Sequence, residues 1–190
     1  IDPAKLGQDA GTFIGLDAPT GVKIVPTLRE ALDTTPADVV LHTTSSYFDL
    51  FKLQIEEIVK AGLNVVSTAE ELSFPWLENH VVADELDALA KEAGKTILGT
   101  GVNPGFLMDA LPLTLTGICQ RVDRIDVTRV INASTRRGPF QAKIGSGMTV
   151  EAFMAKLESG RMGLVGLPES MGMLFDTLGR RLERYEDSVE

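Results

Sequence analysis

The chain has 190 residues, and its 18 lysines and arginines against 27 aspartates and glutamates give a formal net charge of −9. This acidic balance argues against a nucleic-acid partner, because duplex binding normally needs a clustered basic footprint. Hydrophobic residues make up 44% and charged residues 24%, which is typical of a globular chain with a substantial core. The single cysteine, Cys119, excludes a disulfide within the chain and a multi-thiolate metal site.

The start of the chain indicates an excerpt of a longer polypeptide. Ile1, Asp2 and Pro3 are typical of the last step of a strand that enters a turn, and we expect the rest of that strand to precede residue 1. No apolar run approaches the roughly 18 residues that span a bilayer, and no segment has the pattern of a signal peptide. We therefore expect a cytoplasmic protein with no membrane partner.

Strands alternate with helices in the first part of the chain. Apolar and β-branched runs predict strands at 22–25, 38–44, 63–68 and 96–100. Apolar residues at helical spacing predict helices at 28–32, 49–60, 77–93 and 105–116. The run at 38–44 is almost continuously apolar, as in strands that are covered on both faces. The short connections favour right-handed parallel crossovers, so the sequence predicts an α/β fold with an open parallel sheet and helices on both faces.

The pattern changes near residue 119, where we expect a second domain to begin. From 122 to 132 apolar and polar residues alternate, which is typical of a strand with one exposed face. A glycine-rich, basic loop follows at 136–147. Further helices are predicted at 151–158, capped by Thr149, and at 168–185.

Candidate ligand-binding residues follow the run at 38–44. In an open parallel sheet, ligands bind outside the carboxyl ends of the strands. Thr44, Ser45 and Ser46 offer hydroxyl groups there and are small enough to let a ligand approach the backbone. Alternatively, Ser46 or Asp49 caps the following helix. We interpret His42 as a buried histidine with satisfied hydrogen bonds rather than as a catalyst, and neither histidine is placed to bind a metal.

Glu70 and Glu71 follow the strand at 63–68. Two neighbouring carboxylates can orient a cationic substrate or act as general acid and base, because like charges raise one another's pKa. The alternative is that one or both are solvated or cap the following turn.

The string from Gly99 to Phe106 (Gly-Thr-Gly-Val-Asn-Pro-Gly-Phe) is the most specific local pattern. Its three glycines, Gly101 among them, permit close approach, and Asn103 is placed to cap a helix that begins with Pro104. Free backbone amides at such a helix start suit a carboxamide or a carboxylate. A tight turn explains one or two of the glycines, but not easily all three.

The chain carries three informative strings, at 41–46 (Leu-His-Thr-Thr-Ser-Ser), 66–76 (Val-Ser-Thr-Ala-Glu-Glu-Leu-Ser-Phe-Pro-Trp) and 98–106. Together they resemble the 2,4-diaminopentanoate dehydrogenase family, whose members are often labelled dihydrodipicolinate reductase-like. The similarity covers the whole chain, including 1–5 and 166–170. The resemblance implies a protein of nearly twice this length, with an N-terminal Rossmann domain that binds NAD or NADP and a C-terminal α+β domain for substrate binding and oligomerisation.

On this resemblance, residues 1–118 form an incomplete Rossmann domain, a doubly wound parallel sheet without its first strand and phosphate loop. Residues 119–190 begin the C-terminal domain of a homo-oligomer. The first strand lies at the centre of such a sheet. We therefore predict that residues 1–190 alone are not a self-sufficient folding unit and do not hold a dinucleotide.

The resemblance also implies oxidative deamination of a small diamino acid, such as 2,4-diaminopentanoate, through an imine that water hydrolyses to a ketone. From position and charge, Glu70 and Glu71 are candidate catalytic residues that face the substrate ammonium groups, one of them as a base. Arg129 or Arg136 is a candidate for binding the substrate carboxylate. The candidate cofactor-binding residues are Asp2, Thr44, Ser45, Ser46, Gly101 and Asn103.

By the resemblance, Asp2 matches the acid that binds the adenosine ribose. The alternative is a plain turn aspartate before Pro3. The choice between NAD and NADP stays open, because Asp2 repels a 2′-phosphate whereas the nearby Lys5 softens that repulsion.

Two other functions also stay open. The first is an imine reductase of the dihydrodipicolinate reductase type, although those enzymes carry a paired-histidine motif in the substrate domain and no histidine follows His80 here. The second is a non-catalytic ligand-binding or scaffold relative.

Overall fold

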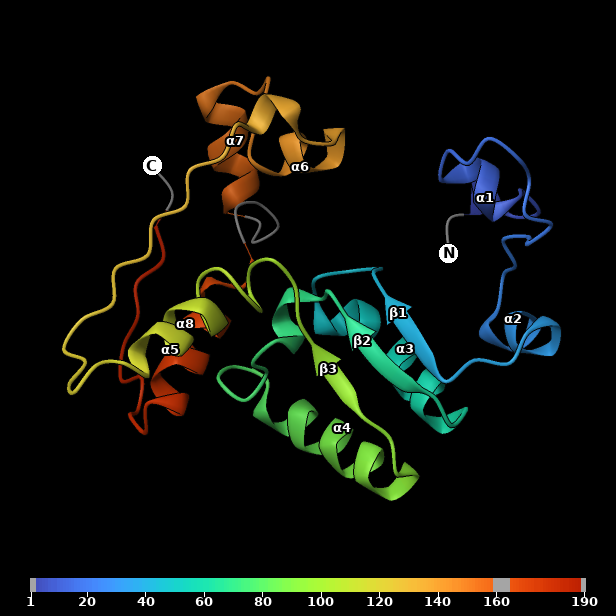
Figure 1. Cartoon of the computed structure of the whole chain (residues 1–190). Helices are drawn as coiled ribbons and strands as arrows, with labels where there is room; N and C mark the ends of the chain where they lie inside the picture. Colours follow the sequence, from blue (N-terminus) through green and yellow to red (C-terminus); the bar gives the residue numbers. More distant parts are fainter. Residues whose placement is uncertain (1–2, 159–164, 189–190) are drawn as a thin grey trace.

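A three-stranded parallel sheet forms the centre of the molecule (Figure 1). The structure is a computed structural model, and it describes residues 3–158 and 165–188. The strands are β1 (Val39–His42), β2 (Asn64–Ser67) and β3 (Ile97–Gly99), in the spatial order β1-β2-β3. In the register of the sheet, Val40 lies beside Val65 and Val66 beside Leu98. The predicted α/β fold class is confirmed.

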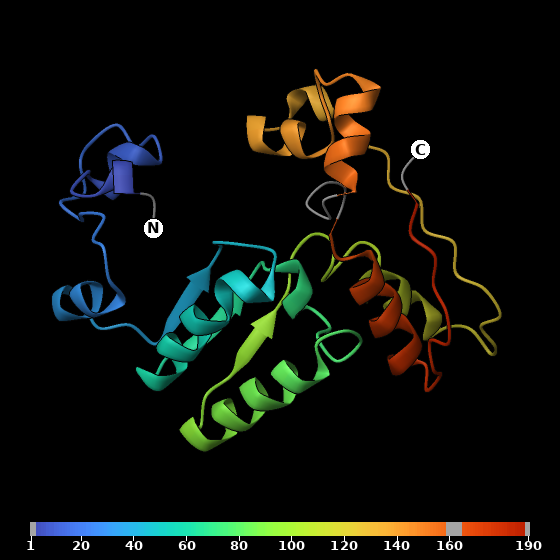
Figure 2. The same cartoon turned by 180° about the vertical axis from the view of Figure 1, so that it is seen from behind.

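Helices α3 (Phe48–Lys60) and α4 (His80–Ala93) connect the strands and cover one face of the sheet (Figure 2). Apolar residues of α3 recur three and four positions apart, so they form one stripe that packs against the sheet. Gly94, in a left-handed conformation with φ +62°, ends α4 as predicted. The buried core comprises Phe48, Phe51, Ile55, Ile58, Val59, Leu63, Val65, Ala69, Leu72 and Leu86.

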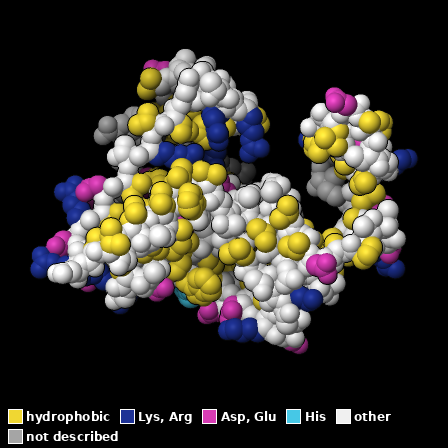
Figure 3. Space-filling model, in the orientation of Figure 1, with side chains coloured by type: hydrophobic (Ala, Val, Ile, Leu, Met, Phe, Trp, Pro, Cys, Tyr) yellow, Lys and Arg dark blue, Asp and Glu magenta, His cyan; other side chains and the backbone are white. Residues whose placement is uncertain are grey.

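The opposite face of the sheet is exposed in the described part of the chain. Successive strand residues point to opposite faces, so Val65 is buried, whereas Leu41 is 74% and Leu98 49% exposed. Hydrophobic side chains are spread over this side of the molecule in Figure 3. The sequence predicts helices on both faces of the sheet, and a strand at 38–44 that is covered on both faces. Helices α3 and α4 instead lie on the same face. Because the strand order runs in one direction, successive right-handed crossovers place their helices on the same face.

The segment before the sheet is organised around Asp9. Its elements are η1 (Pro3–Lys5), α1 (Ala10–Phe13) and α2 (Leu28–Thr34). The Asp9 carboxylate accepts hydrogen bonds from the backbone N–H groups of Thr12, Thr20 and Gly21, and these bonds lower its pKa to about 2. The strand predicted at 22–25 is reduced to one antiparallel bridge, Asp9 with Lys23, because only the short segment before α1 lies beside it.

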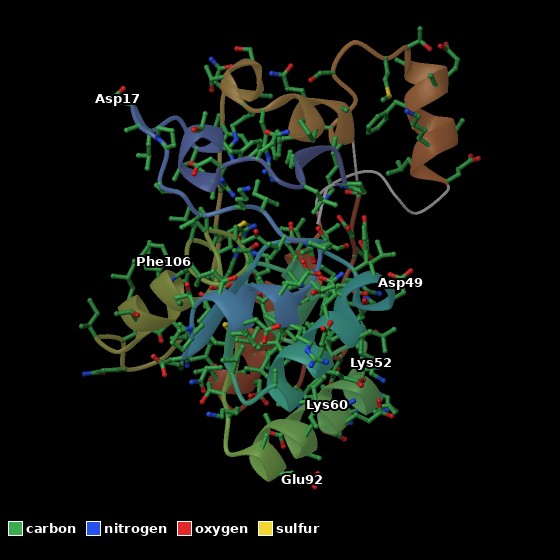
Figure 4. All side chains as sticks on the ribbon, turned by 90° about the vertical axis from the view of Figure 1, so that its right-hand side faces the viewer. Asp17, Asp49, Lys52, Lys60, Glu92 and Phe106 are labelled. Carbon is green, nitrogen blue, oxygen red and sulfur yellow. The ribbon has the colours of Figure 1, made fainter. Side chains whose placement is uncertain are left out.

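The remaining described helices follow β2 and β3. They are η2 (Glu70–Leu72), α5 (Ala110–Thr116), η3 (Ala133–Thr135), α6 (Gly138–Lys143), α7 (Val150–Leu157) and α8 (Leu167–Thr177). Thr149 caps α7, as predicted. Helix α5 begins at Ala110 rather than at 105, because Gly105 has φ +120°, which is outside the helical range. Phe106, labelled in Figure 4, therefore lies in a turn before α5.

The strand predicted at 122–132 is not formed. The described chain runs extended there without a ladder partner, although Val122 and Ile125 are half-buried and alternate with exposed polar residues. The sequence pattern records the burial, but a strand also needs neighbouring backbone to pair with. The helix predicted at 168–185 ends at Thr177. Among the described residues, no helix is both long and apolar enough to cross a membrane.

Candidate functional site

Three chain segments meet at the carboxyl edge of the sheet (Figure 1). Gly166, directly before α8, packs against the segments that follow β2 and β3. A Cβ atom at this position would collide with the ring of Pro104 and lie 3.1 Å from the Cβ of Glu70. Helix α8 therefore begins at the strand ends where ligands bind in open parallel sheets.

Glu169, in the first turn of α8, is only 4% exposed. Burial, together with the negative charges of Glu78, Glu71 and Glu70, raises the pKa of its carboxyl to about 7, and a hydrogen bond from its own backbone N–H partly opposes this rise. The Tyr185 hydroxyl donates a hydrogen bond to Glu78, so a fourth chain segment reaches the same group of carboxylates. The site thus combines a carboxyl that ionises near neutrality with several acidic neighbours.

Sequence reasoning missed Glu169. A glutamate in the first turn of a helix ordinarily stays in solvent and interacts with the helix dipole, so its type and position predict no special role. Its burial comes from the packing of α8 against segments far away in the chain. The available signal was its place in the string at 166–170, which contributes to the family resemblance.

Glu71 caps helix α3 from the neighbouring crossover. Its Oε2 accepts a hydrogen bond of 2.6 Å from the backbone N–H of Phe48, while Tyr47, the N-cap residue, makes no side-chain cap bond. Neither Ser46 nor Asp49 is the N-cap. Burial raises the pKa of Glu71, the bond from Phe48 opposes this rise, and the charges of Asp49, Glu78 and Glu70 add to it. Glu70, half-buried, follows the same strand end.

The hydroxyl residues after β1 are engaged within the chain. The Thr44 Oγ1 donates to Gln54 Oε1 at 2.8 Å, and the Ser45 Oγ accepts from the Tyr47 N–H at 3.3 Å. The Ser46 carbonyl accepts from the Glu71 N–H at 3.4 Å. None of these bonds tests whether Thr44, Ser45 and Ser46 bind a cofactor, so that role stays a prediction. His42 is buried with both ring nitrogens partnered, in agreement with its interpretation.

The glycines after β3 are explained by close backbone packing. A Cβ at Gly99 would collide with the carbonyl of Leu72, and one at Gly105 would collide with the amide of Gly101. A Cβ at Gly101 would lie 3.1 Å from the Pro104 carbonyl oxygen. The turn itself therefore accounts for Gly101 and Gly105, whereas Gly99 is required by the contact of β3 with η2, in agreement with the expectation that a tight turn does not explain all three.

Asn103 and Asp109 shape this turn. Asn103 does not cap a helix, and its Oδ1 is buried without a hydrogen-bond partner among the described residues. Asp109 is fully buried and accepts hydrogen bonds from the Gly105 N–H at 2.8 Å, the Ala110 N–H at 2.6 Å and the Ser170 hydroxyl at 2.8 Å. The Asp109 carboxylate thus ties the turn to α8, next to Glu169.

Two other predicted residues, Arg129 and Arg136, are not brought into contact with this group. Arg129 and Arg136 are exposed, and the Arg136 guanidinium lies 5.2 Å from the ring centre of Phe140. Asp2 lies outside the described residues. The structure therefore unites Glu70, Glu71 and the turn with Gly101 and Asn103, and it adds Glu169.

Known proteins resemble this chain in sequence and in structure. A family model described as the 2,4-diaminopentanoate dehydrogenase C-terminal domain matches residues 106–190. A 2,4-diaminopentanoate dehydrogenase of Acetoanaerobium sticklandii is 39% identical over 161 residues, which are 84% of this chain and 45% of that protein. An amine dehydrogenase of Streptomyces virginiae is 30% identical over 152 residues, 77% of this chain and 41% of that protein.

The solved structure of an amine dehydrogenase from Mycobacterium smegmatis superposes with a TM-score of 0.77 at 25% identity, over 96% of this chain and 54% of that one. This chain thus spans about half the length of its relatives. The resemblance carried by the strand-end strings is confirmed, since the chain matches 2,4-diaminopentanoate dehydrogenase both in the family model and in sequence.

Proposed function

We propose that the protein containing this chain is an NAD(P)-dependent amine dehydrogenase that oxidatively deaminates a small diamino acid, such as 2,4-diaminopentanoate, through an imine to a ketone. One observation carries the proposal: the Glu169 carboxyl is buried, its pKa is raised to about 7, and the nearby charges of Glu70 and Glu71 contribute to that rise. The dehydrogenase names of the relatives support the reaction class.

The chemistry requires a base that is active near neutral pH. An amine carbon gives up hydride only after its ammonium group has lost a proton, and a general base works best when its pKa lies near the working pH. Glu169 meets that condition, whereas an ordinary glutamate, with a pKa of 4.5, is a much weaker base. In this proposal Glu169 accepts the ammonium proton and releases it to solvent, and the regenerated carboxylate then takes a proton from the water that attacks the imine carbon.

Glu70 and Glu71 supply negative charge for the two ammonium groups of a diamino acid. Glu71 keeps one oxygen on the α3 N-terminus, and its carboxylate can still attract a cation. This proposal gives the role of base to Glu169 in place of Glu70 or Glu71, whose predicted role as base stays untested. Arg129 or Arg136 stays our candidate for the substrate carboxylate.

The turn after β3 fits a nicotinamide cofactor. The Asn103 Oδ1 is a buried acceptor without a partner among the described residues, and the carboxamide of nicotinamide offers an N–H₂ donor. Asn103 and Gly101 would hold the nicotinamide end and Asp2 the adenosine ribose, while Thr44, Ser45 and Ser46 stay candidates for contacts with the rest of the cofactor. When bound, NAD or NADP supplies the hydride acceptor.

The full-length protein tests this proposal. NAD and NADP are offered separately with 2,4-diaminopentanoate, ornithine or lysine, and the reduced cofactor is followed by its near-ultraviolet absorbance. We expect amine-dependent reduction with at least one cofactor. Cofactor binding without reduction by any of these amines would favour the imine reductase, and no cofactor binding at all would favour the scaffold relative.

A further inference from the structure

A chain of hydrogen bonds runs through His42, at the end of β1, and connects α3 to the segment before η2. The imidazole is 4% exposed, and its Nδ1 lies 2.8 Å from the Oγ of Ser67, the last residue of β2. Its Nε2 lies 3.0 Å from the Oε1 of Gln54 on α3 and 2.8 Å from the Thr44 Oγ1, which itself donates to the same Gln54 oxygen. The Phe51 ring packs beside the imidazole, with 5.8 Å between the ring centres.

The partners at both ends fix the direction of these bonds. The Ser67 Oγ already accepts from the Ala69 N–H at 3.1 Å, so its hydroxyl hydrogen is available to His42 Nδ1. The Gln54 Nε2 donates to the Leu50 carbonyl at 3.1 Å, which turns Oε1 toward the ring. The tautomer with the proton on Nε2 therefore satisfies every group. Burial lowers the pKa of His42, in keeping with a neutral ring.

The chain of bonds ends one residue before Glu70. Ala69, whose N–H bonds to Ser67, is buried and directly precedes η2, which carries Glu70 and Glu71. The Thr68 N–H also bonds to the His42 carbonyl at 3.0 Å, so the backbone and the side chain of His42 both hold this turn. A shift of Ser67 would therefore be passed directly to the two glutamates.

We propose that His42 is a positioning residue: through Ser67 it holds the turn from β2 to η2 so that Glu70 and Glu71 meet the substrate ammonium groups. This inference rests on the proposed function and deepens it. His42 itself exchanges no proton with the substrate. The Nδ1 atom of His42 accepts the hydrogen of the Ser67 hydroxyl. This orientation leaves a lone pair of the Ser67 oxygen to accept the hydrogen bond from the Ala69 N–H.

Two substitutions at one position separate the two sides of the ring. In His42→Asn the amide oxygen can replace Nδ1 and accept from Ser67, whereas the bond to Gln54 is lost. In His42→Gln the longer amide can replace Nε2 and donate to Gln54, whereas the bond to Ser67 is lost. Ser67→Ala removes the same bond while leaving the imidazole in place.

The test uses the full-length enzyme with the diamino acid and the better cofactor. We expect kcat to fall about tenfold or more in His42→Gln and Ser67→Ala, with the KM for the cofactor little changed, and His42→Asn to keep most of the wild-type kcat. In imidazole nitrogen NMR of the protein without cofactor, we expect His42 as the neutral Nε2–H tautomer, and its Nδ1 signal should move in Ser67→Ala.

Three results would overturn the inference. The first is an unchanged kcat in both His42→Gln and Ser67→Ala, even if both melt at lower temperature. The second is a His42→Asn variant that is as slow as His42→Gln. The third is an Nδ1–H or doubly protonated ring. A wild-type enzyme without amine-dependent turnover would contradict both the proposed function and this inference. Each of the three results above would contradict the inference alone.

Discussion

Glu169 is the residue on which the proposed reaction depends most, and its ionisation gives a signature in the pH profile. A base works only when deprotonated, so kcat/KM of the full-length enzyme should fall as the pH is lowered through about 7, the pKa of this carboxyl. In Glu169→Gln we expect kcat/KM to drop about 100-fold or more and this limb to disappear. The exposed Glu92→Gln is the matched control (Figure 4). A Glu169→Gln profile with the wild-type limb would rule out the role of base.

The same carboxyl makes folding stability depend on pH. Glu169 ionises near pH 7 when folded and near 4.5 when unfolded, so between these values the folded state retains a proton that the unfolded state has released. Raising the pH through this window therefore favours unfolding, and the free energy of unfolding should fall by about 3 kcal/mol.

Glu169→Gln removes this penalty, because its amide does not ionise. We expect the variant to gain stability over the wild type as the pH rises from 4.5 to 7, by up to about 3 kcal/mol in urea denaturation of the full-length protein. A stability difference that is independent of pH would show that the carboxyl ionises normally.

At the scale of elements, the contact between β3 and η2 places the candidate catalytic glutamates. A Cβ at Gly99 would collide with the Leu72 carbonyl, so Gly99→Ala should push η2 away and lower both stability and kcat. Gly138→Ala, with nothing within 4 Å of the added Cβ, is the matched control and should be nearly neutral. Equal behaviour of the two variants in thermal melting and turnover would contradict this packing.

The junction of α5 with α8 depends on Asp109. Asp109→Ala leaves two backbone N–H groups and the Ser170 hydroxyl without their acceptor, and we expect it to lower the free energy of unfolding by about 3 kcal/mol. Ser170→Ala removes only one of these bonds and should cost about 1 kcal/mol. Urea denaturation measures both values. A loss in Asp109→Ala no larger than in Ser170→Ala would mean that the two N–H groups find other acceptors.

For the whole molecule, the local sequence pattern predicted the helices whose packing stripe and ends are set by nearby residues. The spacing of apolar residues in α3 and the glycine after α4 gave both helices to within a few residues. The ends of the three strands also pointed to the candidate site, because parallel strands collect their carboxyl ends at one edge.

Features that depend on contacts between distant segments were not predictable in this way. The alternation at 122–132 reports which side chains are half-buried, but it does not supply a neighbouring strand. Glu169 has an ordinary sequence context, and it becomes unusual only when α8 packs against the ends of β2 and β3. Similarly, the order of strands and helices along the sequence does not predict which face of the sheet each helix covers.

The proposed function requires the full-length protein to remove an amino group from a diamino acid by oxidation. The most direct test measures released ammonium and reduced cofactor together, with 2,4-diaminopentanoate as substrate. The proposed function predicts that one ammonium ion is released for each cofactor reduced, and that neither product forms without the amine. Cofactor binding with no amine-dependent formation of either product would contradict it.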